Sequence, residues 1–148
     1  MKTSLFTLAL ALLFAGLLAG YSSAADSNPY AELTKVPAKE SARANPLAND
    51  PDAVAAGGKL YSLHCAECHG ANAEGNTRGK KKGPALKASE IQQAAPGTLF
   101  WLLTNGSVRK GMPVWSKLPE PQRWQIVTYV KSLNASPTPQ AASSGSSK

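Results

Sequence analysis

One short segment holds both cysteines and both histidines of the chain. Residues 64–70 read HCAECHG, so that Cys65, Cys68 and His69 form a C-x-x-C-H motif. This motif is typical of covalent haem attachment, in which the two thiols form thioethers with the porphyrin and the histidine becomes an axial ligand of the iron. Since residues three and four apart share one face of a helix, all three side chains can reach the same edge of a flat ring. The motif therefore predicts one covalently bound haem c and its iron.

Other interpretations of the cysteines have less support. A zinc site needs about four Cys or His ligands, and here only His64 could join the motif, although it is adjacent to Cys65 and poorly placed to complete a tetrahedron. A dithiol redox pair normally lies in a βαβ unit, which this glycine-rich, helical pattern does not offer. A disulfide between Cys65 and Cys68 would close so small a loop that it would add little stability.

The N-terminus has the pattern of an export signal. Lys2 gives a positive charge, residues 5–20 are an apolar run, and small residues precede a predicted cleavage after Ala24 or Ala25. We therefore interpret residues 1–25 as a signal peptide and expect a periplasmic protein. An uncleaved anchor is the alternative, but the apolar run is shorter than the roughly 20 residues of a spanning helix. Membrane association is expected only through an uncleaved signal or a partner complex.

The rest of the chain divides into three parts. Residues 26–49 contain three prolines and no sustained period, which predicts an irregular extension with at most a turn of helix at 30–34. Residues 50–134 form the single folded domain. Residues 135–148 are rich in Ser, Ala and Pro and are predicted to be a disordered tail. A core this small is marginal by itself, so we expect the haem-free chain to fold poorly.

The folded domain is predicted to be all-α. Asp50 fits an N-cap and Pro51 the first helical position of a helix that runs towards Cys65. Gly57 and Gly58 cost that helix about 1 kcal/mol each relative to alanine, which indicates that another helix crosses at close range, with Tyr61 beside the crossing. The predicted partner begins near residues 119–121 and has its apolar stripe at Ile126, Tyr129, Val130 and Leu133.

Two further helices are expected between these. One covers about 88–94, and an apolar, buried one follows, with Thr98 as its N-cap and Gly106 as the left-handed residue after its end. The segment GPAL at 83–86 ends the loop after the motif. The carbonyl of Pro84 could accept the second ring N–H of His69, and Leu86 could cover a haem face.

Met112 is the candidate for the second axial ligand. Once Met1 leaves with the signal peptide, it is the only methionine of the chain. A lone methionine more often fills a gap in a core. Here Gly111 and Pro113 predict a rigid, extended loop, and no second usable histidine exists, because His64 is tied to the ring edge beside Cys65 and is expected to be partly exposed and non-ligating.

The formal net charge of +7 favours anionic partners. Arg78 and Lys80 to Lys82 form a basic run in the loop after the motif. Such a run is most often a solvated loop, and nucleic-acid binding does not suit an exported haem protein. The functional interpretation is electrostatic guidance of an acidic redox partner towards the haem edge.

Taken in order, these motifs resemble the class I monohaem cytochromes c of bacteria. The resemblance covers about residues 52–133 and implies an all-α fold whose first and last helices cross, with His69 as proximal and Met112 as distal ligand. The long extension before Asp50 and the compact interval from His69 to Met112 differ from the mitochondrial form.

The resemblance and the ligand set predict a periplasmic one-electron carrier and not an enzyme, because both axial positions are filled. A cytochrome subunit docked to a periplasmic dehydrogenase or terminal oxidase is the alternative. A ligand-binding or peroxidatic haem protein, in which Met112 dissociates easily, is a third.

Overall fold

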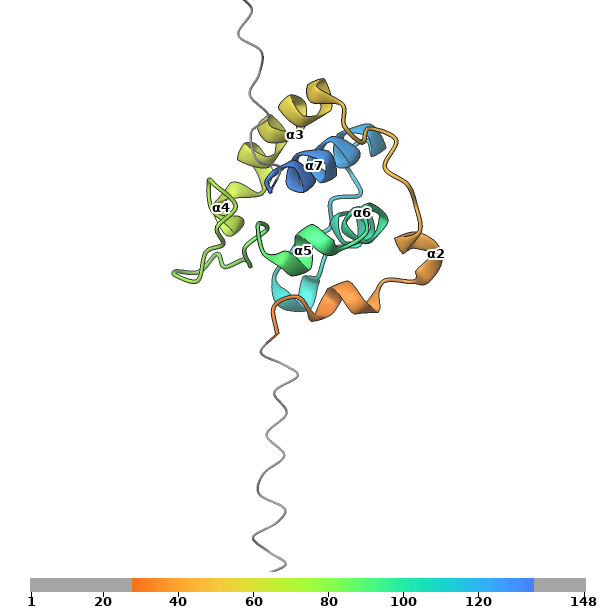
Figure 1. Cartoon of the computed structure of the whole chain (residues 1–148). Coiled ribbons are helices and arrows are strands. Elements are labelled where there is room, and N and C mark those ends of the chain that lie inside the picture. The colour runs from red at the N-terminus through yellow and green to blue at the C-terminus, as the bar shows by residue number, and fades with distance from the viewer. Residues whose placement is uncertain (1–27, 135–148) are drawn as a thin grey trace, which may run out of the picture.

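The computed structural model describes residues 28–134, and these are helical, with no strand among them (Figure 1). The prediction of an all-α fold is confirmed. The predicted signal peptide, the first two residues of the extension and the predicted tail lie outside the described residues. In chain order the elements are the 3-10 helix η2 (Ala31–Lys35), α2 (Ala38–Ser41), α3 (Pro51–His64), α4 (Ala66–His69), α5 (Ser89–Gln93), α6 (Pro96–Asn105), the 3-10 helix η3 (Val108–Lys110) and α7 (Glu120–Ser132).

The crossing of α3 and α7 is the main contact of the fold, and it lies where the glycines predict it (Figure 1). A Cβ built on Gly57 would stand 2.0 Å from the carbonyl oxygen of Gln125, and one on Gly58 would stand 3.2 Å from the ring of Tyr129. Tyr61 is fully buried and its ring centroid lies 5.2 Å from that of Tyr129. The absence of a side chain at Gly57 therefore lets two helix backbones touch.

The ends of α3 and α7 follow the capping pattern of the sequence. The Asp50 carboxylate accepts hydrogen bonds from the backbone N–H groups of Asp52 and Ala53, at 2.9 and 3.2 Å, and Pro51 occupies the first turn. Pro119 precedes the first residue of α7. Of the stripe predicted on α7, Ile126 and Val130 are buried, and Tyr129 and Leu133 are half-buried and packed against the core, so the stripe faces the core.

The middle helices differ from expectation in one respect. α6 begins at Pro96, so the prediction that Thr98 is its N-cap is wrong. Proline is favoured in the first turn because its missing N–H has no helical partner there. Thr98 is instead buried, and its hydroxyl is 2.7 Å from that of Ser41. Gly106 follows the last residue of α6 with φ +69°, as predicted. The predicted helix at 88–94 is α5.

The segment at 28–49, called the strap below, is more ordered than the predicted irregular extension. It contains η2 and α2, and both contact α6 (Figure 1). Gly97 allows this close approach, since a Cβ there would stand 2.3 Å from the carbonyl oxygen of Glu40. The Arg43 guanidinium lies 4.6 Å from the centroid of Phe100, which stacks on Trp124 at 4.0 Å. Tertiary contacts thus attach the strap to α6, and the hydrophobic periodicity of its sequence does not predict them.

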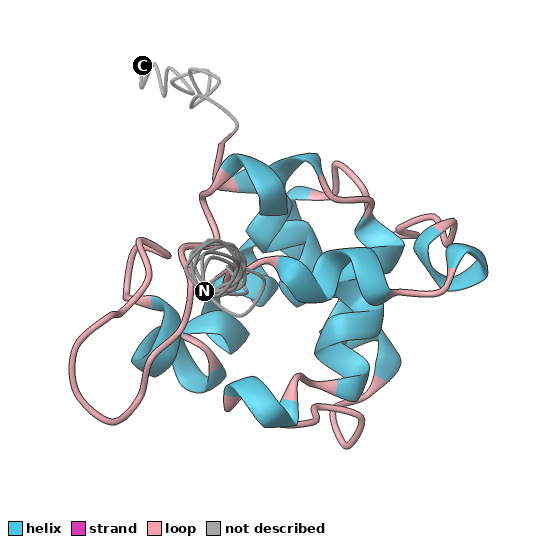
Figure 2. Cartoon of the chain, turned by 90° about the horizontal axis from the view of Figure 1, so that it is seen from below, coloured by secondary structure: helices cyan, strands magenta, loops and turns pink. Residues whose placement is uncertain are grey.

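Seen from below, helices surround the centre of the described region on several sides (Figure 2). Within residues 28–134, no helix combines the length and hydropathy needed to cross a bilayer.

Candidate haem site

One cavity of about 710 Å³ lies between the strap, α3, α4, α6 and α7. All four predicted site residues line it: Cys65, Cys68, His69 and Met112. The remaining walls are largely apolar and include Leu86, Leu99, Leu103, Ile126, Val127 and Val130. Its volume falls in the range of about 300–1,000 Å³ typical of cofactor pockets. The fold therefore brings the two thiols, the imidazole and the thioether to a single apolar space.

The two cysteines lie at the junction of α3 and α4. Cys65 caps both helices, and its carbonyl accepts the backbone N–H of His69 at 2.9 Å. Both cysteines are free thiols. Burial, and secondarily the neighbouring Cys68, raises the pKa of Cys65 to about 11. The unmodified chain therefore presents Cys65 as a neutral thiol.

The His69 ring is oriented as the sequence suggests. Its Nδ1 lies 2.9 Å from the carbonyl oxygen of Pro84. Burial lowers the pKa of His69, partly opposed by this hydrogen bond. A neutral ring that donates its Nδ1–H to Pro84 has an unprotonated Nε2, which is the form able to bind a metal.

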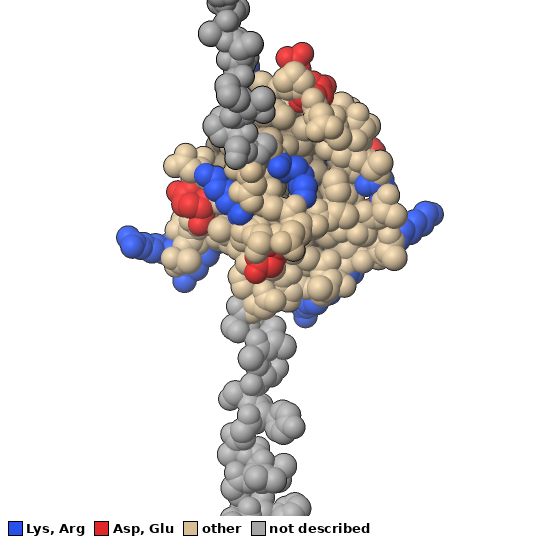
Figure 3. Space-filling model, in the orientation of Figure 1, with Lys and Arg blue, Asp and Glu red and all other residues tan. Residues whose placement is uncertain are grey.

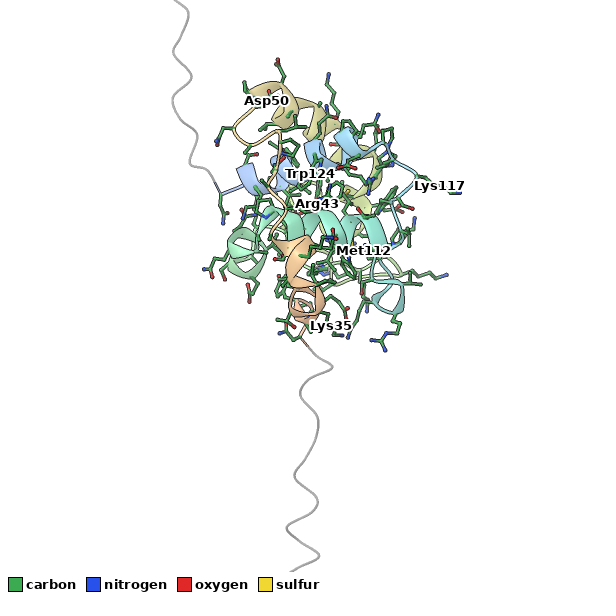
Figure 4. All side chains as sticks on the ribbon, turned by 90° about the vertical axis from the view of Figure 1, so that its right-hand side faces the viewer. Lys35, Arg43, Asp50, Met112, Lys117 and Trp124 are labelled. Atoms are coloured by element: carbon green, nitrogen blue, oxygen red, sulfur yellow. The ribbon has the colours of Figure 1, made fainter. Side chains whose placement is uncertain are left out.

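Met112 follows a tight turn and pairs with Ser107 as an antiparallel bridge residue, in keeping with the predicted extended segment. After Gly106 the chain forms η3 and then returns through Gly111, which is left-handed at φ +89°. Ser107 and Met112 exchange both backbone hydrogen bonds, at 3.0 and 3.1 Å. Three residues after Met112, the N–H of Trp115 donates to the carbonyl of Leu103 at 3.2 Å. The turn places the half-buried Met112 on the cavity wall (Figure 4).

His64 also lines the cavity, but it contacts another side chain. Its ring centroid lies 5.0 Å from that of Trp115. It is half-buried, in keeping with the expected partly exposed residue. Within residues 28–134, no three His, Cys, Asp or Glu side chains converge as the donor set that a zinc ion would need.

Three residues that line the cavity were not identified from the sequence. Tyr30 and Leu33 of the strap line it, although they precede the motif by more than thirty residues. Trp115 lines it as well, from the segment after Met112. The large apolar side chains of Tyr30 and Leu33, three residues apart, are a signal that could have suggested burial.

The basic run projects where the loop between α4 and α5 extends from the body (Figure 3). Lys80, Lys81 and Lys82 line the mouth of the cavity. Lys81 forms an ion pair with Glu67 at 2.6 Å, and this hydrogen bond raises the pKa of Lys81. Both side chains are exposed, so the pair contributes little stability, but it partly neutralises the run.

A flat, largely apolar cofactor with two vinyl groups fits this arrangement, since two thiols lie at one wall of an apolar cavity and a soft thioether and an imidazole also line it. An all-α chain with such a site is a c-type cytochrome.

The chain belongs to the family described as cytochrome c oxidase, cbb3-type, subunit III, whose sequence profile matches residues 52–130. It is also 30% identical over 115 residues to a cbb3-type cytochrome c oxidase subunit CcoP from Rubrivivax gelatinosus. This match covers 76% of the chain and 34% of that relative, so the chain spans about a third of the relative's length. No solved structure matches the chain. Membership of this cytochrome c family implies covalently bound haem c with iron and a role in electron transfer.

Proposed function

We propose that this chain is a periplasmic one-electron carrier whose haem is attached through Cys65 and Cys68 and ligated by His69 and Met112. One observation carries the proposal: these four side chains, from two segments more than forty residues apart, line the same apolar cavity. On this proposal the chain turns over no substrate of its own.

The bound haem supplies an iron that gains or loses one electron. The residues of the chain determine how it does so. Pro84 orients the His69 ring, and the Ser107–Met112 backbone pair holds the thioether in place. If His69 and Met112 both held the iron, no coordination site would stay open for a reactant. A soft thioether ligand raises the reduction potential, and the apolar walls limit access of water.

The partner is proposed to be a redox protein with an acidic docking surface. Lys80, Lys82 and Lys110 lie with Lys81 at the cavity lining. These lysines outnumber the two carboxylates of the lining, Glu32 and Glu67. An excess of one sign beside the site of electron exchange speeds encounter with an oppositely charged partner, and screening by salt weakens the effect. Such contacts are small and transient.

A second candidate is a cytochrome subunit docked permanently to a terminal oxidase. Membership of the subunit III family and the similarity to an oxidase subunit support it. Size-exclusion chromatography of the native protein from its own membranes and periplasm separates the two. A single small species in the periplasmic fraction supports the carrier, and co-elution with a large membrane complex supports the subunit.

The ligand assignment is tested with carbon monoxide. Parent ferrous protein should resist binding, and Met112→Ala should bind readily because it opens one axial position. Val108→Ala is the matched control, since Val108 lies in the same turn but is 70% exposed. If the parent binds carbon monoxide as fast as Met112→Ala does, Met112 is not the ligand, and the ligand-binding alternative gains support.

A further inference from the structure

The strap contacts the loop that orients His69. The hydroxyl of Tyr30 donates a hydrogen bond to the carbonyl oxygen of Ala85 at 3.1 Å. Ala85 directly follows Pro84, whose carbonyl oxygen lies 2.9 Å from Nδ1 of His69. Consecutive peptide groups of one loop thus contact the strap on one side and the imidazole on the other.

Hydrogen bonds also hold both ends of this loop. Gly83 exchanges both backbone hydrogen bonds with Asn76, at 2.9 and 3.0 Å. Leu86 donates its N–H to Ala73 at 2.9 Å, and its carbonyl accepts from the Gln92 side chain at 2.7 Å. The Leu86 N–H and the Ala85 carbonyl belong to one peptide group, so Ala73 holds this group on one side and the Tyr30 hydroxyl holds it on the other, next to the carbonyl that orients His69.

Tyr30 is suited to this task. Its ring lines the cavity and packs against the core together with Leu33. Burial, and secondarily the charge of Glu90, raises the pKa of its hydroxyl, so the group stays protonated and can donate at neutral pH. The strap itself is seated on α6 through the hydroxyls of Ser41 and Thr98, 2.7 Å apart.

We propose that Tyr30 is a positioning residue for His69, holding the Ala85–Leu86 peptide so that the adjacent Pro84 carbonyl keeps the His69 ring in its orientation. The inference rests on the proposed function, in which His69 ligates the iron. A hydrogen bond to the other ring nitrogen makes a ligating imidazole a stronger electron donor and so tunes the metal. Loosening the loop weakens that bond, which favours the ferrous state and raises the reduction potential.

The test compares three variants of the holoprotein, each of which loses one side-chain hydroxyl group. Tyr30→Phe keeps the ring in the cavity wall and removes the hydroxyl. Ser41→Ala loosens the strap at a distance from the loop, and Tyr129→Phe removes a hydroxyl at the helix crossing. We measure the midpoint potential and the solvent exchange rate of the His69 ring N–H by NMR.

The expected result is a positive shift of the potential and faster exchange of the His69 proton in Tyr30→Phe, with both controls at parent values. An unchanged potential in Tyr30→Phe, or an equal shift in Ser41→Ala, overturns the inference, the latter because a merely structural role of the strap would act through either contact. Failure of the proposed function can be distinguished from failure of this inference. In that case the parent protein itself would bind carbon monoxide, while the exchange rate of the His69 ring proton would still show whether the Tyr30 hydroxyl affects the ring.

Discussion

Gly57 of α3 lies against the backbone of Gln125 of α7, so closely that a Cβ on the glycine would stand 2.0 Å from the carbonyl oxygen. This contact joins the helix that leads into the C-x-x-C-H motif to the helix that lines the opposite part of the cavity. The spacing of the two helices is therefore part of the haem site.

We predict that Gly57→Ala destabilises the holoprotein despite the helix propensity of alanine, which is about 1 kcal/mol better than that of glycine. Overpacking against a backbone atom costs about 1–3 kcal/mol or more. Gly58→Ala is the matched control, because its Cβ would meet only the movable ring of Tyr129, at 3.2 Å. Thermal unfolding should show a clear drop for Gly57→Ala and a small change of either sign for Gly58→Ala. Equal melting temperatures for the two variants would contradict the close crossing.

Gly106→Ala should release Met112 from its place on the cavity wall. The position has φ +69°, and a Cβ would stand 2.8 Å from the carbonyl oxygen of Met112 and 2.7 Å from that of Pro113. Gly111→Ala imposes similar backbone strain at φ +89° but meets nothing within 4 Å. Carbon monoxide should bind ferrous Gly106→Ala markedly faster than Gly111→Ala. The reverse order would show that the turn at Gly111, and not the return past Gly106, places the thioether.

Glu120 is expected to stabilise the fold at neutral pH and to lose this effect as the pH falls into the acid range. Its carboxylate accepts from the Trp124 indole N–H at 3.3 Å and pairs with Arg43 at 2.7 Å, and these interactions, the indole first, lower the pKa of Glu120. Figure 4 shows Arg43 beside Trp124. Because the folded state favours the ionised form, this contribution is present above the unfolded pKa, about 4.5, and is lost as pH falls through the lower folded value.

Glu120→Gln should therefore flatten the decline of the melting temperature below about pH 4.5. Glu90→Gln, an exposed glutamate on α5 that accepts from Ser89, is the control. An unchanged pH profile in Glu120→Gln would mean that solvent screens the interaction completely.

Neutralising Lys80 and Lys82 should slow electron transfer to an acidic partner at low salt. The double variant with glutamine is expected to lose most of the dependence of the bimolecular rate on ionic strength, since like charges beside the exchange site steer encounter. Lys59→Gln removes an exposed charge on α3 that is not part of the cavity lining. Stopped-flow rates across a salt series provide the measurement. If Lys59→Gln has the same effect as the double variant, only net charge matters.

Removing the thioether bonds should leave the chain poorly folded. The double variant Cys65→Ala and Cys68→Ala cannot attach the cofactor, and a cavity of about 710 Å³ would then open at the centre of a small core. Empty apolar cavities destabilise in proportion to their size, and domains of this length have only about 5–15 kcal/mol to lose. Far-UV circular dichroism should show reduced helicity relative to the holoprotein. A variant that melts as cooperatively as the holoprotein would contradict this expectation.

The sequence alone determined the elements whose signals are local. The cap at Asp50, the glycine pair at 57–58 and the proline before α7 each constrain the backbone within a few residues, so the helices and their crossing could be inferred from them. The C-x-x-C-H spacing likewise carries its own chemistry, because both thiols and the imidazole must meet one ring.

Only the tertiary structure decided how distant segments meet around the cavity. The strap has no period, yet Gly97 and the Ser41–Thr98 contact seat it on α6, and Tyr30 reaches the loop beside His69. The backbone pairing of Met112 with Ser107 likewise has no signal in the local sequence. These features depend on contacts between residues far apart in the chain. The energies of such contacts come from burial and long-range hydrogen bonds, which a local sequence pattern does not show.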